Sequence, residues 1–469
     1  MTRGTIVFIL KKRYNIPISL SYRQEEAFVM NKKCIFIIFA ACILVLGACF
    51  SAWRGDEGTI SISIGGGEAV GRAAAGTTGG AATDGDGEFS WPDEVFHTIT
   101  FSGGSGPGPN QSGIKGGKTV HFSVAPGQWT ITIEAFYTNK EDSTKGVIGP
   151  LAEGSRTVNI KSGPNGTVVI PMSIKVIDDD DDTNSGKAGT LRWAIQDVVQ
   201  MSKKNIDIVI DLPEGDNEII LKGTLPDIEG KSVTIRAKKD VTIKRFSNNF
   251  IASFFTIGEG GTLILDGPIT IDGGNQDNPS IDSPIAPLIT INGGAFIMNK
   301  DVTLQNNTNN NGKGGGVSVD GNGTFTMNNG TISGNKAITT TATDDSKGGG
   351  VYVLNGTFTM KGGTIKGNIA AASGTPLPAE GYGGGVYVDD NGKFIKTGGT
   401  INGVDDPSLS TVSPDANTTQ PSGQGNAVFV TEKTDPTDAT IVVRIGNKKD
   451  TTIGPTDNLD SETTDEWDN

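Results

Sequence analysis

The stretch GVSVDGNGTFTMNNGTISGN (316–335) decides the fold, because the chain repeats it. Matching units lie at 254–274, 288–307, 350–368, 385–403 and, in degenerate form, from 427 onward. Each unit contains three short strands of alternating polar and apolar residues, followed by a loop of variable length. Because no single unit can bury its apolar face alone, the repetition predicts units that stack on one another.

The alternation also predicts which side chains stack inside. A first column contains Phe255, Ile289, Val317, Val351, Val386 and Val428. A second column contains Leu263, Phe296, Phe325, Phe358 and Phe394, and a third contains Ile269, Val302, Ile332, Ile365 and Ile401. Three columns predict a three-sided coil of parallel strands. Antiparallel propeller blades are the rival arrangement, which three strands per unit and a single variable loop disfavour.

Polar residues accompany these columns at two places. A ladder of side-chain amides is predicted from Asn307, Asn335 and Asn368, which mark the same turn in successive units. Lys396 occupies the inward slot that Met327 and Met360 fill in the units before it. This position indicates looser packing near the end of the stack rather than a catalytic base.

The repeat motifs resemble a known fold family. GGGVYV (348–353), GTFTM (356–360) and GGTI (362–365) resemble the pectin-lyase-like right-handed parallel β-helix, especially the polymorphic outer-membrane and adhesin-like repeats and spirochaete-type surface lipoproteins. SGKAGTLRWAI (185–195) is similar to the start of such domains, where a short helix covers the open end of the core. The resemblance covers about 183–455. It implies a right-handed coil, and the helical spacing of Leu191, Ala194, Ile195, Val198 and Val199 predicts its N-terminal capping helix.

The amino terminus has the pattern of an export signal. An apolar run at 35–48 follows two lysines and is short for a membrane span. It ends in LGAC (46–49), which resembles the lipobox of bacterial lipoproteins and implies that Cys49 is lipidated. A plain signal peptide with an incidental cysteine is the alternative. Because all three cysteines lie in this segment, no disulfide is expected in the exported chain.

Composition divides the rest of the chain. A lipoprotein signal peptide is expected at 1–48, in which 1–29 is either an upstream mis-start before Met30 or a long N-terminal region of the signal. The following parts are a flexible tether at 49–90, a β-sandwich at 91–176, an acidic linker at 177–188, a parallel β-helix at 189–455 and an acidic tail at 456–469. Alternating runs such as QWTITIEAFY (128–137) resemble Ig-like or transthyretin-like sandwiches. His97 and His121 fall in such runs and are interpreted as ordinary strand positions. The fold class is therefore all-β, with a small antiparallel β-sandwich before the capped β-helix.

The charged residues bear on two kinds of partner, nucleic acid and metal ions. The formal charge is −14, and nucleic acid is not expected as a partner because it requires basic patches. The run Asp178–Asp182 is interpreted as a solvated linker. The alternative is a weak Ca²⁺ site with Asp178, Asp180 and Asp182 as oxygen ligands. No other cofactor is expected.

Candidate functional residues lie on the outward side of the repeats. Tyr352, Tyr387 and Phe429 occupy equivalent outward positions and form either an exposed ladder that stacks on sugar rings or a packing ladder covered by the variable loops. Those loops are expected at 336–347, 369–382 and 404–424, on the side where a repeat protein usually binds its ligand. No histidine follows His121, so the β-helix lacks the histidine-dependent centre of the family's hydrolases.

The sequence therefore favours a binding role over an enzymatic one. The leading hypothesis is a lipid-anchored protein of the cell envelope, at the outer membrane or cell surface, whose β-helix acts as an adhesin-like module for a glycan or a host or matrix protein. A polysaccharide lyase or glycoside hydrolase is the alternative, because catalytic residues from different coils can meet on the surface. A purely structural envelope protein is the second alternative.

Overall fold

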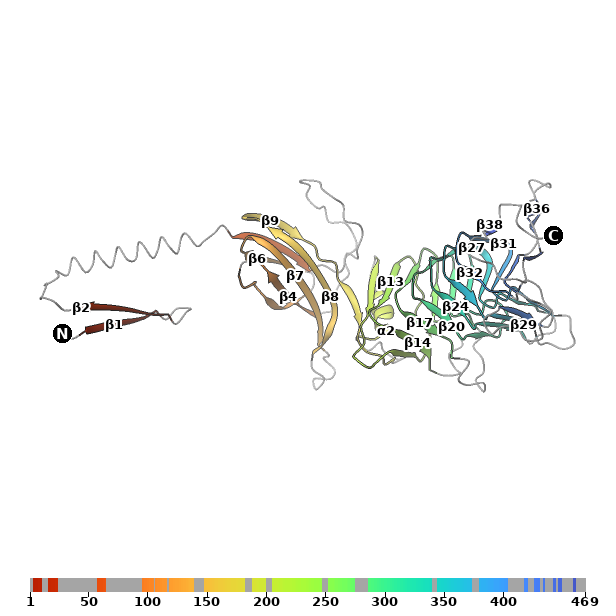
Figure 1. Cartoon of the computed structure of the whole chain (residues 1–469), viewed down its shortest axis with the longest axis horizontal. Helices are drawn as coiled ribbons and strands as arrows, with labels where there is room; N and C mark the ends of the chain where they lie inside the picture. Colours follow the sequence, from red (N-terminus) through yellow and green to blue (C-terminus); the bar gives the residue numbers. More distant parts are fainter. Residues whose placement is uncertain are drawn as a thin grey trace.

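The computed structural model is almost entirely β-structure. It describes residues 3–10, 16–23, 57–64, 95–104, 106–115, 118–138, 147–181, 188–199, 205–246, 252–274, 286–339, 344–372, 379–403, 417–420, 426–430, 433–434, 442–443, 446–448 and 459–460. Figure 1 shows a sandwich in orange and yellow, followed by a long stack of strands that runs from green to blue. The expected all-β class is confirmed at this level.

The sandwich consists of two sheets around one apolar interior. One sheet contains β3 (Gly58–Ile64), β6 (Lys118–Val124) and β9 (Gly163–Val168). The other contains β4 (Val95–Gly103), β5 (Gln111–Lys115), β7 (Gly127–Thr138) and β8 (Val147–Ile160), all paired antiparallel. Alternate residues of each strand point inward, and Ile62, Ile99, Phe101, Trp129 and Ile131 form the centre of this core.

Strand β3 corrects the boundary of the tether. The seven residues Gly58–Ile64 were expected in a flexible segment, but β3 pairs antiparallel with β6 and parallel with β9. Ile60 and Ile62 bury their side chains in the sandwich core. The tether assignment is therefore wrong for this strand, because its alternating isoleucines find partners that lie far away in the sequence.

The sandwich sheet passes directly into the stack. Strand β10 (Ser173–Val176) pairs antiparallel with β8 on one edge and parallel with β11 (Ile206–Ile210) on the other. The two parts also share apolar contacts, because Ala135 and Leu151 of the sandwich belong to the same buried cluster as Leu191 of the stack. The sandwich and the stack are thus joined by backbone hydrogen bonds and by a common core.

The helical segment lies at the end of the stack nearest the sandwich (Figure 1). It consists of α2 (Leu191–Trp193), which continues as the wider turn η1 (Ala194–Val199). The Thr190 hydroxyl accepts a hydrogen bond from the Trp193 backbone N–H at 3.2 Å, as an N-cap does. The apolar residues that predicted a helix face the core, including Leu191, Ala194, Ile195 and Val199. The side chain of Val198 lies outside the described residues.

The stack contains long parallel sheets whose strands follow one another in coil order. The largest sheet continues from β10 and the sandwich strands β4, β5, β7 and β8 and also includes β37 (Gly446–Lys448) and β38 (Leu459–Asp460). Its parallel strands in the stack are β11, β13 (Ser232–Ala237), β15 (Phe255–Ile257), β16 (Thr262–Asp266), β18 (Ile289–Asn292), β19 (Ala295–Met298), β22 (Val317–Asp320), β23 (Gly323–Met327), β27 (Val351–Met360), β31 (Val386–Lys396) and β34 (Val428–Val430). The first and second columns are confirmed, since like residues pair in register from Phe255 to Val428 and from Leu263 to Phe394. Rings of the second column stack with centroids 4.6–5.1 Å apart.

A second parallel sheet contains the third column. Its strands are β12 (Glu218–Leu221), β14 (Val241–Arg245), β17 (Ile269–Asp272), β20 (Thr303–Gln305), β24 (Thr331–Ser333), β28 (Thr364–Lys366) and β32 (Thr400–Ile401). Here the expected column is wrong at its start, because Ile332 pairs with Leu304 and Leu304 pairs with Ile271. Ile269 and Val302 are nevertheless buried, since a shift of two residues keeps a side chain on the same face.

Segments expected as loops contain two more parallel sheets. One contains β21 (Thr308–Asn309), β25 (Lys336–Thr339), β29 (Ile369–Ala372) and β33 (Thr418–Gln420), and the other pairs β26 (Ser346–Lys347) with β30 (Gly381–Tyr382). The expectation of loops at 336–347, 369–382 and 404–424 is wrong at these strands. In the first of these sheets Ala337 pairs in register with Ala370.

The chain ends also differ from expectation where the structure describes them. Strands β1 (Arg3–Leu10) and β2 (Ile16–Arg23) pair as an antiparallel hairpin in a region without a predicted fold. Near the C-terminus β38 (Leu459–Asp460) pairs antiparallel with Ile395 and Lys396 of β31, so two residues of the expected acidic tail form a strand. Antiparallel pairs also join β34 to β37 (Gly446–Lys448) and β35 (Lys433–Thr434) to β36 (Val442–Val443).

The expected export signal at 1–48 lies mostly outside the described residues. Among the described residues no helix combines the length and the apolar character that crossing a membrane requires. The apolar run at 35–48 and the lipidation candidate Cys49 both lie outside the described residues.

Candidate functional site

The aromatic ladder is buried and does not face a ligand. Tyr352 is 3% exposed, Tyr387 is 2% exposed and Phe429 is 9% exposed. Their rings pack against one another with centroids 5.5–5.6 Å apart, and Tyr382 of β30 packs beside Phe429 at 4.9 Å. The interpretation as exposed, ligand-facing aromatics is therefore wrong. The alternative, a packing ladder covered by the variable segments, is confirmed, because Tyr382 in the expected loop 369–382 packs against these rings.

Charged groups surround the buried aromatics. The Tyr352 hydroxyl donates to Asp389 at 3.2 Å, and the Lys347 ammonium lies 4.9 Å from the centroid of the Tyr387 ring. Burial raises the pKa of both phenols, and the nearby Asp389 carboxylate adds to this effect. Both tyrosines are therefore neutral at physiological pH, so neither offers a phenolate as a base. The cluster connects successive coils through packing and hydrogen bonds.

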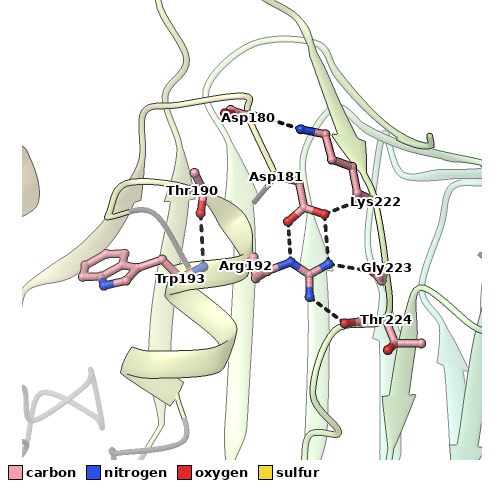
Figure 2. A network of polar contacts seen from close by, with 8 residues as sticks. All are labelled: Asp180, Asp181, Thr190, Arg192, Trp193, Lys222, Gly223 and Thr224. Carbon is pink, nitrogen blue, oxygen red and sulfur yellow. Dashed lines mark hydrogen bonds and ion pairs between the residues drawn. The ribbon is translucent and has the colours of Figure 1, made fainter. Parts of the chain in front are cut away.

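The acidic linker contains a buried ion pair (Figure 2). Asp181 is 1% exposed and Arg192 is 4% exposed. Arg192 donates from Nε to Asp181 Oδ1 at 2.5 Å and from Nη2 to Oδ2 at 2.9 Å, a bidentate geometry. It also donates to the carbonyls of Gly223 and Thr224 at 2.7 Å and 2.6 Å. The interpretation of 178–182 as a solvated linker is therefore wrong at Asp181.

A second aspartate of this run, Asp180, also has a charged partner in Figure 2. The Lys222 ammonium contacts Asp180 at 2.8 Å, and the Lys222 backbone N–H donates to Asp181. The Asp178 carboxylate accepts the backbone N–H of Asp180 at 3.0 Å. Asp182 lies outside the described residues. Within the described part of the chain, no group of three or more His, Cys, Asp or Glu side chains is placed to hold a metal ion.

The amide ladder is confirmed and is longer than expected. Asn335 donates to Asn368 Oδ1 at 3.1 Å, and Asn368 donates to Asn417 Oδ1 at 3.0 Å. The Asn307 backbone N–H donates to Asn335 Oδ1 at 3.2 Å. All four side chains are fully buried. Sequence reasoning missed Asn417, because the loop before it is longer than in the earlier units and hides the repeat spacing.

A groove crosses the outer side of the second parallel sheet where its strands begin. It has a volume of about 660 Å³ and is lined by residues at the starts of β14, β17, β20, β24 and β28, which are consecutive neighbours in the sheet. Its polar side chains are Asp240, Asp301, Thr303, Asn329, Thr331 and Thr364. None of the described residues that line it is basic or aromatic.

The threonines of the groove belong to a longer column. Thr303 pairs with Thr331, and Thr331 pairs with Thr364, so their side chains lie in register across the coils. The same column continues to Thr270 on one side and to Thr400 on the other. Parallel strands lie ~4.8 Å apart, so hydroxyl groups recur at this step along the stack. The groove was not predicted from the sequence.

Two glycines belong to the lining of the groove. Gly330 and Gly363 have φ of +99° and +87°, values that favour glycine. A Cβ atom would lie 2.5 Å from the Val302 carbonyl oxygen at Gly330, and 2.5 Å from the Gly330 carbonyl oxygen at Gly363. Both positions therefore require glycine, because the backbone of the preceding coil lies close to them.

The remaining ionisable residues of interest belong to the scaffold, and only His121 among them is exposed. His97 is fully buried and its Nδ1 lies 3.1 Å from the Ile114 carbonyl, while His121 Nδ1 lies 2.8 Å from the Ser61 hydroxyl. Burial lowers the pKa of Arg245 to about 9, and its guanidinium lies 4.5 Å from the Phe254 ring centroid. Lys396 is 1% exposed and pairs with Met360, as its inward slot predicts. None of these residues lines the groove.

The chain was compared with family models, curated proteins and solved structures. No family model, no curated protein and no solved structure matches this chain. The interpretation of the groove therefore depends on its own geometry and chemistry.

Proposed function

We propose that this chain is a lipid-anchored cell-envelope protein and that its repeats form a right-handed, three-sided parallel β-helix which acts as a binding module. The parallel sheets and the in-register columns support the β-helix. The α2–η1 segment buries Leu191 and Ile195 at the start of the stack, and in this proposal it closes the open end of the core.

The groove is the observation that carries the binding role. It crosses five consecutive strands of a well-packed stack and presents hydroxyl, amide and carboxylate groups to solvent. A ligand of several units gains contacts at each coil, and the stack holds those contacts at fixed spacing before binding, which reduces the ordering cost. Partners on this view are extracellular glycans or host and matrix proteins.

The test is saturable binding by the full exported chain. Immobilised protein is exposed in surface plasmon resonance to a panel of glycans and matrix proteins, with and without Ca²⁺. We expect saturable binding to at least one ligand, and a total lack of saturable binding to the panel would overturn the proposal.

An ultraviolet assay for unsaturated uronides distinguishes the lyase alternative. In the β-elimination of that family a basic side chain removes a proton from the uronate, and none of the described groove residues is basic. We therefore expect no increase in absorbance with polyuronate. Turnover that disappears in an Asp301→Asn variant would establish an enzyme in place of a binding module.

The lipid anchor and the location at the outer membrane or cell surface are proposed from LGAC (46–49) alone. Several acyl chains at one cysteine hold a protein stably on a membrane. Expressing cells are labelled with radioactive palmitate, and the label is expected in the wild-type protein but not in a Cys49→Ser variant. Equal labelling of the two proteins would exclude lipidation at this residue.

A further inference from the structure

We propose that the groove binds a neutral, hydroxyl-rich polysaccharide whose chain lies parallel to the axis of the stack. This inference rests on the proposed binding function and specifies its site and its ligand. The juxtaposition that carries it is a column of in-register threonines beside carboxylates, without a basic residue among the described lining.

The direction of the chain follows from the repetition. The groove extends over the starts of β14, β17, β20, β24 and β28, a length of about 19 Å for four steps of ~4.8 Å. Over the last three of these strands the same chemical group recurs, since Thr303, Thr331 and Thr364 lie in register. A ligand that repeats its own hydroxyl groups forms the same contact at successive coils, whereas a compact ligand uses only one or two of them.

The chemistry of the lining suits sugar hydroxyls. Each threonine hydroxyl donates one hydrogen bond and accepts others, and the Asn329 amide does both, so these groups pair with hydroxyls of either orientation. The threonine methyl groups offer small apolar contacts to the C–H faces of a sugar ring.

The charge of the groove disfavours an anionic chain. Asp240 and Asp301 line it, and both are exposed. One partner reduces this charge, since the Lys300 ammonium lies 3.6 Å from the Asp301 carboxylate at an exposed position. An excess of negative charge remains on a chain whose formal charge is −14, so a polyuronate is repelled and a neutral chain is not.

The experiment measures oligosaccharide binding by isothermal titration calorimetry with the full exported chain. The neutral probes are cellohexaose, maltohexaose, mannohexaose and chitohexaose, and hexagalacturonate is the anionic probe. We expect saturable binding of at least one neutral probe, little change in its affinity between low and high salt, and no binding of hexagalacturonate.

Substitutions in the groove test whether the neutral probe binds there. The double variant Thr331→Val, Thr364→Val removes two hydroxyls with little change in shape, and we expect it to weaken binding of the neutral probe about tenfold or more. The matched control is Thr359→Val in β27, which changes the same residue type in the same coil outside the groove and is expected to leave affinity within twofold. Unfolding curves of all variants verify that each is folded.

The outcomes separate this inference from the proposed function. Saturable binding of a matrix protein without binding of any neutral probe overturns the groove assignment but retains a binding module. The assignment is also overturned if the double variant binds the neutral probe with unchanged affinity, or if hexagalacturonate binds more strongly than the neutral probes. A lack of saturable binding to every glycan and matrix protein overturns both.

Discussion

At the residue scale, the buried pair of Asp181 and Arg192 connects the acidic segment to the first coils. Its two charges are removed from water, and their hydrogen bonds extend to Gly223 and Thr224 (Figure 2). A buried pair is a weak source of net stability, but removal of one partner leaves an uncompensated buried charge. Because removing one partner costs much more than the intact pair contributes, a substitution of Arg192 tests whether this junction is formed as the structure shows it.

We expect Arg192→Met to lower the free energy of unfolding by about 3–5 kcal/mol, because Asp181 then remains charged and buried without its partner. Urea unfolding followed by circular dichroism measures the change. The control is Lys222→Met, since the Lys222–Asp180 pair is exposed and such pairs contribute about 0–1 kcal/mol. Equal losses in the two variants would contradict the structural role of the buried pair.

His97 is expected to make the sandwich sensitive to mild acid. Burial lowers its pKa below the ordinary value of 6.5, so the folded state holds it neutral where the unfolded chain already binds a proton. Stability is therefore complete above pH 6.5 and is lost as pH falls below that value. Unfolding midpoints measured from pH 7.5 to pH 5 are expected to decline in the wild type.

The two histidines provide an internal control for this dependence. His97→Gln is expected to flatten the decline between pH 7 and pH 5, whatever its effect on absolute stability. His121→Gln changes the other histidine, which hydrogen-bonds to Ser61 at an exposed position, and is expected to retain the decline. If the decline of the unfolding midpoint with falling pH disappeared in His121→Gln and persisted in His97→Gln, burial of His97 would not be the cause of the decline.

Sequence patterns predicted burial at this scale better than they predicted exposure. Alternation placed Phe358 inside and Tyr352 outside, and the first assignment is confirmed. Tyr352 points away from the core but is covered, because β26 and β30 lie over it. Period-two patterns describe one sheet and its two faces, and contain no information about a second layer that covers the outer face.

At the scale of elements, the amide ladder connects the turns of successive coils. Asn335 accepts the Asn307 backbone N–H and donates to the Leu304 carbonyl at 3.0 Å and to Asn368. Each asparagine thus satisfies buried backbone groups of its neighbours, which otherwise lack water.

We expect Asn335→Leu to destabilise the stack by about 1–3 kcal/mol for each buried group left without its hydrogen bond. The control is Asn328→Leu, because Asn328 is exposed and donates to Asn299 of the adjacent coil at 2.9 Å. Its loss is expected to stay within about 0.5 kcal/mol. Chemical denaturation compares the two, and a larger loss in the control would refute the assignment of stability to the buried ladder.

The elements were predicted well where residues repeat and poorly where partners are distant. Phe325 and Phe358 align by sequence alone because their flanking residues are nearly identical. The third column began two residues early at Ile269, since a two-residue shift preserves the buried face and leaves no mark in the pattern. Strand β3 went unassigned to the sandwich, because its partner β6 lies beyond a segment of unrelated composition.

At the scale of the whole molecule, the sandwich and the stack form one hydrogen-bonded unit through β10. We expect them to unfold together in a single calorimetric transition. Ala152→Asp introduces a charge at a fully buried position of this junction, where an unpaired charge costs several kcal/mol. In that variant we expect the transition to split into two.

Ser155→Asp provides the matched control. It introduces the same charge three residues along β8 at an exposed position and is expected to change stability within about 0.5 kcal/mol. Two separate transitions in the wild type would mean that the junction does not couple the two parts. This coupling was not foreseen from the sequence, because β8, β10 and β11 have no mutual similarity. The groove was not foreseen either, because a repeat pattern shows which residues point outward but not where the outer surface is hollow.

The continuous sheet has a mechanical consequence for a protein held at a surface. Drag on a ligand in the groove would load the stack, and the load would reach the sandwich through the paired strands β11, β10 and β8 instead of a hinge. Along this path the load runs across the strands, in the direction of the hydrogen bonds that join them. If the proposed binding role holds, the groove stays at a fixed distance from the sandwich under such a load.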